Sequence, residues 1–251
     1  MTSSKIGAIV LGAGKGTRMK SDLPKVMLHL CGKPMIRHII DSMEAIGADR
    51  IVTVIALDGQ SVKDEVAPYP TCVQERQLGT GNAVLAAKEA MKGFDGDILV
   101  IFGDNPITTP ATYQKMIAKR HEGGYGVVVL GFRPEDPARY GRLKVKNGEL
   151  EKIVEFKDAT DEEKAINLCN SGIMCFDGKV MFDILEKIGN KNAAGEYYLT
   201  DAIEVARAQG LKCMVVECPA EEVGGANTLE ELALLETYLQ QRQGQQKACN
   251  S

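Results

Sequence analysis

The sequence of 251 residues is poor in metal ligands of the zinc type, with three histidines and seven cysteines that form no CxxC pair. Structural zinc sites use clustered cysteine and histidine ligands, so no such centre is expected. An odd cysteine count without an export signal indicates reduced thiols and a cytoplasmic protein.

Long hydrophobic runs are also absent. The run 98–102 has five residues, far fewer than a membrane span requires, and the run 6–11 is too short for a signal peptide. There is no internal repeat, low-complexity segment or proline-rich linker, and a composition with 44% hydrophobic and 25% charged residues excludes disordered and collagen-like classes. We therefore expect one domain over residues 1–240, followed by a polar tail at 241–251 that frays.

Charge of one sign does not dominate, since 30 basic and 34 acidic residues give a net charge of -4, which argues against nucleic-acid binding. Residues 1–38 differ, because this segment contains seven basic residues and only one acidic residue, Asp22. This excess indicates a site for a compact polyanion such as a triphosphate, although a solvated basic face would look the same. The basic residues are Lys5, Lys15, Arg18, Lys20, Lys25, Lys33 and Arg37.

Strand-like and helix-like segments alternate up to residue 132, which predicts an open parallel sheet with helices on both faces. Thr109 followed by Pro110 is a helix start signal. Strands are expected at 6–11, 50–57, 71–74, 97–102 and 127–132, and helices at 34–46, 60–67, 82–91 and after residue 109.

Beyond residue 140 the pattern changes to a hairpin, with strands 142–146 and 150–157 around the turn Asn147-Gly148. Thr228 and Glu231 form a capping-box signature for a last helix running toward Gln243. The fold class is therefore α/β, a mixed, mostly parallel sheet flanked by helices. Further strands are expected at 172–176 and 212–218, and helices at 179–188 and 201–209.

The glycine-rich loop LGAGKGTR at 11–18 follows the first strand. Its glycines can turn backbone N–H groups toward phosphates, and Lys15 and Arg18 add charge. Thr17 breaks the dinucleotide fingerprint, and no Walker pattern is present, so a plain strand-to-helix turn is the alternative interpretation. Lys25 follows Pro24, whose fixed φ lets the lysine reach the same phosphates.

Polar residues follow two further strands. Gln74 and the string QLGTG at 77–81 can read a flat base edge, although an ordinary helix N-terminus is the alternative. Asp104 follows the central strand, where a carboxylate facing a phosphate loop is typical of a Mg²⁺ ligand. Asn227 could supply a second oxygen, but its spacing alone favours a turn residue or helix N-cap.

Several strings occur in an order that resembles the sugar nucleotidyltransferases, and most specifically the N-acetylglucosamine-1-phosphate uridylyltransferase domain. The resemblance covers nearly all of residues 5–240 and implies a single-domain Rossmann-like nucleotide-diphospho-sugar transferase fold. The narrowest strings are QLGTG, EFKDAT and EYYLTD. The full set is LGAGKGTR at 11–18, PK at 24–25, QLGTG at 77–81, GD at 103–104, YGR at 140–142, VEFKDAT at 154–160, NSG at 170–172 and GEYYLTD at 195–201.

The resemblance assigns roles to named positions. UTP and N-acetylglucosamine 1-phosphate would react to give UDP-N-acetylglucosamine and pyrophosphate, with Mg²⁺ as cofactor. Nucleotide contacts would come from Leu11, Gly12, Ala13, Gly14, Gln74, Gly79, Thr80 and Gly103, and triphosphate contacts from Arg18 and Lys25. Mg²⁺ would lie on Asp104 and Asn227, and the sugar on Gly141, Glu155, Asn170, Tyr198 and Thr200.

The sequence departs from the family pattern in two respects. Gly12 stands where many members have alanine, a change that puts little in doubt. No hexapeptide period marks the β-helical acetyltransferase domain of the bifunctional enzymes, so we expect no acetyl transfer and a monomer or small homo-oligomer, with neither a nucleic-acid nor a membrane partner.

Two other functions stay open. The chain could act on another sugar 1-phosphate, such as glucose 1-phosphate, or serve as a non-catalytic sugar-nucleotide sensor, although a sensor has no need for Arg18, Lys25 and Asp104 together. A Rossmann dehydrogenase is disfavoured, because the fingerprint is broken and Asp58 is a weak match to the acidic residue after the second strand.

Overall fold

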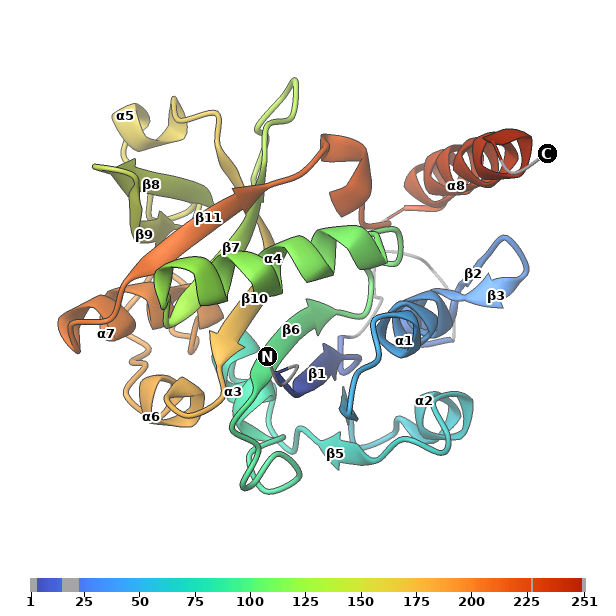
Figure 1. Ribbon diagram of the computed structural model, residues 1–251, viewed down its shortest axis with the longest axis horizontal. Helices are drawn as coiled ribbons and strands as arrows, with labels where there is room; N and C mark the ends of the chain where they lie inside the picture. Colours follow the sequence, from blue (N-terminus) through green and yellow to red (C-terminus); the bar gives the residue numbers. More distant parts are fainter. Residues whose placement is uncertain (1–3, 15–22, 227, 250–251) are drawn as a thin grey trace.

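The computed structural model describes residues 4–14, 23–226 and 228–249. Within these residues a nine-stranded sheet forms the centre of the molecule (Figure 1). Its strand order is β11 (Cys213–Glu217), β7 (Val127–Phe132), β10 (Cys169–Asp177), β6 (Asp97–Phe102), β1 (Ile6–Leu11), β4 (Arg50–Ile55) and β5 (Thr71–Val73), with β8 (Arg142–Lys146) and β9 (Glu149–Val154) extending it from β10.

Strand direction confirms the mixed, mostly parallel sheet. β1 pairs in parallel with both β4 and β6, and β11 pairs in parallel with β7, whereas β10 runs antiparallel to β6 and β7. The predicted hairpin is present as β8 and β9. Its turn residues Asn147 and Gly148 have φ angles of 54° and 80°, the left-handed conformation that an Asn-Gly hairpin turn uses.

Helices cover both faces, as predicted (Figure 1). Successive strand residues such as Ile9 and Val10 pack into different clusters, because side chains alternate across a sheet. No helix in the described part of the chain is both long and apolar enough to cross a bilayer. One face packs against α1 (Met35–Ala45), α2 (Gln60–Glu65) and α4 (Pro110–Gly123), and the other against α3 (Thr80–Leu85), α6 (Met181–Leu185) and α7 (Ala202–Ala208).

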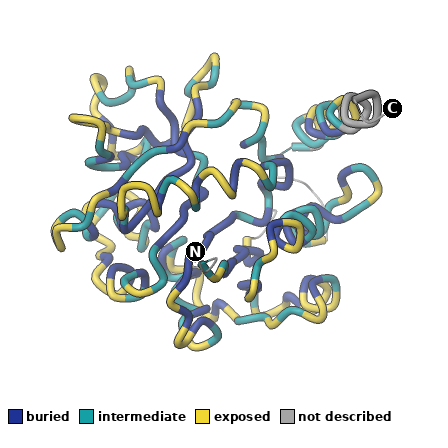
Figure 2. The backbone as a smooth tube through the Cα atoms, viewed as in Figure 1, coloured by how far each residue is buried: buried dark blue, intermediate teal, exposed yellow. Residues whose placement is uncertain are grey.

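The central strands match the sequence prediction because both of their faces are covered. β1, β6 and β7 have the predicted bounds, and Figure 2 shows these strands buried while the helices keep exposed outer surfaces. The predicted helix start is also confirmed, since the Thr109 side chain accepts a hydrogen bond from Thr112 N and Pro110 is the first helical residue.

Several boundaries differ from the prediction. β10 begins at Cys169, three residues earlier than expected, because its start pairs with the end of β7 around a bulge. α3 ends at Leu85 rather than at Met91, and turns follow. The short ribbon β2 (His29–Leu30) and β3 (Lys33–Pro34) was not predicted, since two-residue strands carry no periodicity.

The last helix, α8 (Leu229–Cys249), runs beyond Gln240 and so extends into the segment expected to be a polar tail. Leu235 and Leu239 pack with residues near the β2–β3 ribbon, and Arg242 Nη1 donates to Ile107 O at 2.7 Å. These contacts hold the middle of α8, and the following glutamine, lysine and alanine residues are good helix formers. Thr228 Oγ1 accepts from Glu231 N at 3.1 Å, as the capping signature predicted.

Three short 3-10 helices are also present in the described chain: η1 (Lys25–Met27), η2 (Leu199–Asp201) and η3 (Ala220–Val223). A one-turn helix, α5 (Asp161–Lys164), contacts β8. η1 follows Pro24, η2 precedes α7, and η3 precedes the turn that leads to α8.

A buried ion-pair network lies at the start of β6, at the end of the strand remote from Asp104. Asp97 is fully buried, and its carboxylate accepts from Arg120 Nε and lies 2.8 Å from His121 Nε2. Arg120 Nη1 also contacts Asp177 at 3.2 Å. The network fixes α4 to β6 and β10.

Arg120→Met should destabilise the fold, because it leaves the Asp97 carboxylate buried without its main partner. We expect the free energy of unfolding in urea to fall by about 3–5 kcal/mol. Lys119→Ala is the matched control on the same helix, since Lys119 pairs with Glu122 at the surface, and it should change stability little. Equal stability losses in the two variants would contradict this account.

Candidate functional site

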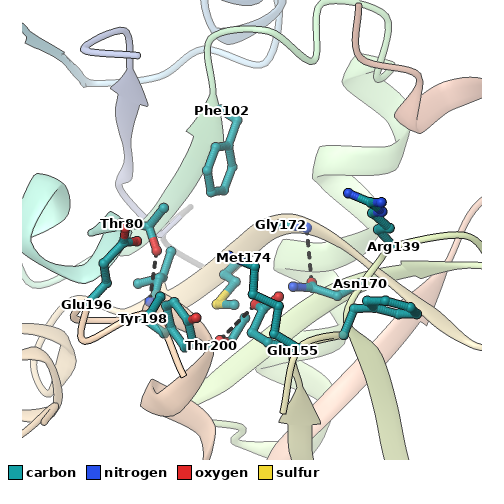
Figure 3. Close-up of a pocket in the computed structure, with 14 residues that line it drawn as sticks. Thr80, Phe102, Arg139, Glu155, Asn170, Gly172, Met174, Glu196, Tyr198 and Thr200 are labelled. Carbon is teal, nitrogen blue, oxygen red and sulfur yellow. Dashed lines mark hydrogen bonds between the residues drawn. The ribbon is translucent and has the colours of Figure 1, made fainter. Parts of the chain in front are cut away.

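Three adjoining cavities surround the carboxyl end of β6. The loop cavity has a volume of about 360 Å³ and lies beside the glycine-rich loop. The wide cavity has a volume of about 520 Å³ and lies beside β9 and β10. The turn cavity has a volume of about 280 Å³ and lies beside the Asp104-Asn105 turn. Phe102, the last residue of β6, lines all three, and Figure 3 shows its ring above the other labelled residues of the wide cavity. The cavities are therefore joined around this residue.

The loop cavity gathers most of the residues predicted to bind a nucleotide. It is bounded by the carboxyl ends of β1 and β6, by the residues after β5 and by the start of α3. In open α/β sheets this edge is where ligands bind. The predicted residues that line it are Leu11, Ala13, Gly14, Gln74, Gly79 and Thr80, together with Lys25 and Asp104.

Two of the predicted nucleotide contacts, Gly12 and Gly103, do not line these cavities. Gly12 N donates to Val54 O at 2.7 Å, and Gly103 N donates to Leu11 O at 2.9 Å. A Cβ on Gly103 would lie 2.8 Å from Leu11 O. In the described structure these glycines hold the ends of β1, β4 and β6 together.

The QLGTG segment is held in place by the EYYLTD segment, which lies far downstream in the sequence. Thr80 of the first segment and Thr200 of the second are 120 positions apart. Tyr197 N donates to Leu78 O and Gly81 N donates to Tyr197 O, both at 2.8 Å. Thr80 Oγ1 accepts from Leu199 N at 2.9 Å. Gly79 has a φ of +115°, and a Cβ there would lie 2.6 Å from Tyr197 O, so a larger residue would break this arrangement.

Gln74 is almost fully buried, and its amide donors are already in use. Nε2 donates to Gly79 O at 3.2 Å and to Asn82 Oδ1 at 3.1 Å. Its remaining capacity toward a ligand is therefore the acceptor Oε1. Gln77 Nε2 donates to Ala13 O at 2.9 Å and so connects the glycine-rich loop to this segment.

A charged pair lies where the loop and turn cavities meet. Lys25 Nζ lies 2.5 Å from Asp104 Oδ2, and the Asp104 side chain is 30% exposed. The backbone of the 224–226 turn packs here, because a Cβ on Gly225 would lie 3.2 Å from Asp104 O and 2.9 Å from Asn105 Oδ1. Arg18 and Asn227, predicted for the triphosphate and the metal, lie outside the residues that the structure describes.

The donor set at Asp104 suits a magnesium site completed by a ligand. No group of three histidine, cysteine, aspartate or glutamate side chains in the described ranges could hold a metal ion. Mg²⁺ is usually bound by one or two carboxylates together with phosphate oxygens and water, which a single half-buried carboxylate beside two cavities can satisfy. Asp104 fits this mode.

The wide cavity contains polar groups from β10, from η2 and from the residues that follow β9 (Figure 3). Thr200 Oγ1 donates to Glu155 Oε1 at 3.1 Å, and Asn170 Oδ1 accepts from Gly172 N at 3.0 Å. Burial raises the pKa of Glu155, although the hydrogen bond from Thr200 opposes this effect. Tyr198 lines the same cavity, so four of the five predicted sugar contacts gather in it.

The fifth predicted sugar contact, Gly141, lines the turn cavity. Its carbonyl accepts from Asn170 N at 2.8 Å, which connects the start of β8 to β10. Asn170 and Glu155 line both the wide and the turn cavities, so Gly141 lies at the border between them.

Sequence reasoning missed several lining residues. Phe102 was assigned only to the strand, Glu196 lines both the loop and wide cavities, and Arg139 lines both the wide and turn cavities. Arg139 directly precedes the YGR string, and Glu196 belongs to the EYYLTD string, so their positions beside recognised motifs were the available signal.

Comparison of the fold identifies solved structures with the same architecture. A UDP-glucose pyrophosphorylase complexed with UDP-glucose has a TM-score of 0.77 at 19% identity, with 95% of this chain and 99% of that chain covered. A putative glucose-1-phosphate thymidylyltransferase from Bacillus anthracis has a TM-score of 0.75 at 20% identity, with 93% and 94% covered. The fold is therefore that of the nucleotidyltransferases.

The family can be stated more closely. The model of the MobA-like NTP transferase domain matches residues 8–166, and the chain belongs to this family. The sequence is 51% identical over 240 residues to the bifunctional protein GlmU of Rhodospirillum rubrum, covering 95% of this chain and 54% of that protein. The corresponding protein of Paramagnetospirillum magneticum is 49% identical over 243 residues, covering 96% and 54%. The chain spans about half the length of these curated relatives.

A fourth, acidic cavity of about 230 Å³ lies next to Glu155 and contains Asp201. Burial is the main cause that raises the pKa of Asp201 to about 6 from an ordinary value of 3.8, and the Glu204 carboxylate adds to it. The folded state therefore holds a proton that the unfolded state releases at lower pH. Stability from this group is present at low pH and is lost as the pH rises through about 6.

Asp201→Asn should stabilise the protein at pH 8, because it removes a carboxylate that is costly to ionise in the folded state. At pH 4.5 the gain should be much smaller, since the wild-type carboxyl is then protonated. Thermal unfolding at the two pH values measures the difference. A variant that is less stable than the wild type at pH 8, or equally stabilised at both values, would show that burial does not control this group.

Proposed function

We propose that the chain transfers a uridylyl group from UTP to N-acetylglucosamine 1-phosphate, releasing pyrophosphate. The observation that carries this proposal is the joining of the loop cavity to the wide cavity at Phe102, with Lys25 and Asp104 beside the junction. A nucleotide in one cavity and a sugar in the other would bring their phosphates together at that junction. The similarity to proteins named GlmU supports the same reaction.

The loop cavity suits a uracil base. The Gln74 donors are used by Gly79 and Asn82, so Oε1 is its free acceptor and matches the N3–H donor of uracil. Cytosine offers an acceptor at this position, and it would leave the buried Gln74 oxygen without a partner. Such a mismatch is costly, which favours UTP over CTP.

The wide cavity suits an amino sugar. Glu155 can accept hydrogen bonds from sugar hydroxyls, and Asn170 keeps its NH₂ group as a donor because its oxygen is held by Gly172. An N-acetyl group needs a polar partner and an apolar wall, and Met174 and Phe156 line the cavity beside these polar groups.

The reaction needs no general base on the protein, because the attacking phosphate oxygen is already an anion. The chain's contribution is to position the two phosphates for in-line displacement and to stabilise the charge on the departing pyrophosphate. Lys25, with Arg18, would hold the triphosphate, and Asp104, with Asn227, would hold Mg²⁺. When bound, the ion supplies positive charge that reduces the repulsion between the two phosphates.

A panel of nucleoside triphosphates against sugar 1-phosphates tests the proposed reaction. With Mg²⁺ and pyrophosphate release as the measurement, UTP with N-acetylglucosamine 1-phosphate should have the highest kcat/KM, roughly 100-fold above glucose 1-phosphate. A preference for glucose 1-phosphate would assign the chain to another sugar. Binding of UDP-sugars without turnover on any pair would indicate a sensor.

Charge-removing variants test the assigned roles. Asp104→Ala should abolish Mg²⁺-dependent turnover, and Arg18→Ala or Lys25→Ala should lower kcat by on the order of 100-fold with the fold intact. Lys33→Ala is the matched control, because this lysine belongs to the same basic segment but pairs with Asp41. Near-native kcat in the Asp104 and Arg18 variants would remove the mechanism.

A further inference from the structure

Arg139, to which the sequence analysis gave no role, lies where two of the cavities join. It lies in the exposed segment between β7 and β8 and lines both the wide cavity and the turn cavity. Within the described part of the chain its guanidinium has no hydrogen-bond or ion-pair partner, and Figure 3 shows it at the rim opposite Glu196. A cation facing a cavity with no protein anion attached is available to a ligand.

The segment that carries Arg139 is held rigidly by Arg142, which is only 3% exposed. Its guanidinium donates to Pro137 O and Ala138 O, each at 3.3 Å, and also to Tyr140 O. These carbonyls precede and follow Arg139 in the chain. The hydrogen bonds from Arg142 therefore fix the backbone on both sides of Arg139.

Two further features show that this conformation is constrained. Ala138 has a φ of 38°, a left-handed conformation that is unfavourable for alanine and persists only where the surroundings impose it. The Tyr140 ring packs edge-on against Phe132 at 4.9 Å between centroids. The backbone that carries the Arg139 side chain is therefore constrained by its own contacts.

The charges of the turn cavity indicate what Arg139 binds. Asp104 and Glu155 line this cavity, and Arg139 is the one lysine or arginine among its described lining residues. Under the proposed function, the neutral groups of the sugar are matched by Glu155, Asn170 and Thr200 in the wide cavity. A guanidinium has donors only, in a planar fork that matches the oxygens of a phosphate.

We propose that Arg139 binds the phosphate of the incoming sugar 1-phosphate and so contributes to selection of a phosphorylated sugar. This inference rests on the proposed function, because it places the sugar in the wide cavity and its phosphate toward Asp104. Lys157 also lines the wide cavity but does not line the turn cavity, which Asp104 lines, and it is not given this role. Lys25 lies on the loop-cavity side of Asp104 and serves the nucleotide phosphates.

The test replaces Arg139 and separates the two substrates. Arg139→Gln should raise KM for N-acetylglucosamine 1-phosphate roughly 10- to 100-fold, the effect of losing a hydrogen bond to a charged group, and leave KM for UTP unchanged. Arg139→Lys should restore part of the loss, because it returns the charge without the planar fork. Arg133→Ala is the matched control, since this nearby arginine pairs with Glu217 at the surface.

Several outcomes would overturn the role of Arg139. They are an unchanged KM for the sugar phosphate in Arg139→Gln, an equal rise in KM for UTP, an equal effect in Arg133→Ala, or a lysine variant as weak as the glutamine variant. Thermal unfolding checks that each variant is folded, which we expect because the Arg139 side chain holds no other part of the described structure.

Calorimetric titration keeps this test independent of turnover. N-acetylglucosamine 1-phosphate is titrated into the wild-type chain and into Arg139→Gln. Weaker binding by the variant supports the assignment, and equal binding overturns it. A wild-type chain that binds the sugar phosphate but releases no pyrophosphate would instead contradict the proposed reaction and leave the assignment of Arg139 to be judged by this titration.

Discussion

The antiparallel direction of β10 between β6 and β7 is the constraint on which the site depends. Parallel strands bring only their carboxyl ends to one edge of a sheet, whereas an antiparallel neighbour brings its first residues to that edge. The start of β10 therefore lies against the end of β6, and a Cβ on Gly172, whose φ is +89°, would lie 2.7 Å from the Phe102 ring. Phe102 lines both the loop cavity and the wide cavity, so this contact places the start of β10 where the two cavities meet.

The loops around the place where the loop and wide cavities meet are held by hydrogen bonds from other segments of the chain. Tyr197 and Leu199 hold the QLGTG segment, and Arg142 holds the segment of Arg139. Glu222 plays a similar part near Asp104, since its carboxylate accepts from Thr109 N at 3.1 Å and from Thr112 Oγ1 at 2.6 Å, which anchors η3 ahead of the 224–226 turn. A reaction that depends on positioning benefits from such support.

The sequence predicted best what is encoded locally. The buried strands at 6–11, 97–102 and 127–132 and the Thr109 cap follow from short apolar runs and capping chemistry. The early start of β10, the connection of Tyr197 to Leu78 and the exposure of Arg139 to two cavities depend on contacts across many residues, which no local pattern reports. The backbone bonds by which Gly12 and Gly103 connect strand ends likewise depend on contacts across the sheet.

A crystal structure of the chain with UDP-N-acetylglucosamine and Mg²⁺ tests the central claim most directly, because that molecule must occupy both cavities at once. The account predicts the uracil in the loop cavity against Gln74, the amino sugar in the wide cavity against Glu155, and the diphosphate passing Phe102 beside Asp104. A ligand whose sugar ring lies in the loop cavity, or whose diphosphate avoids Asp104, would contradict it.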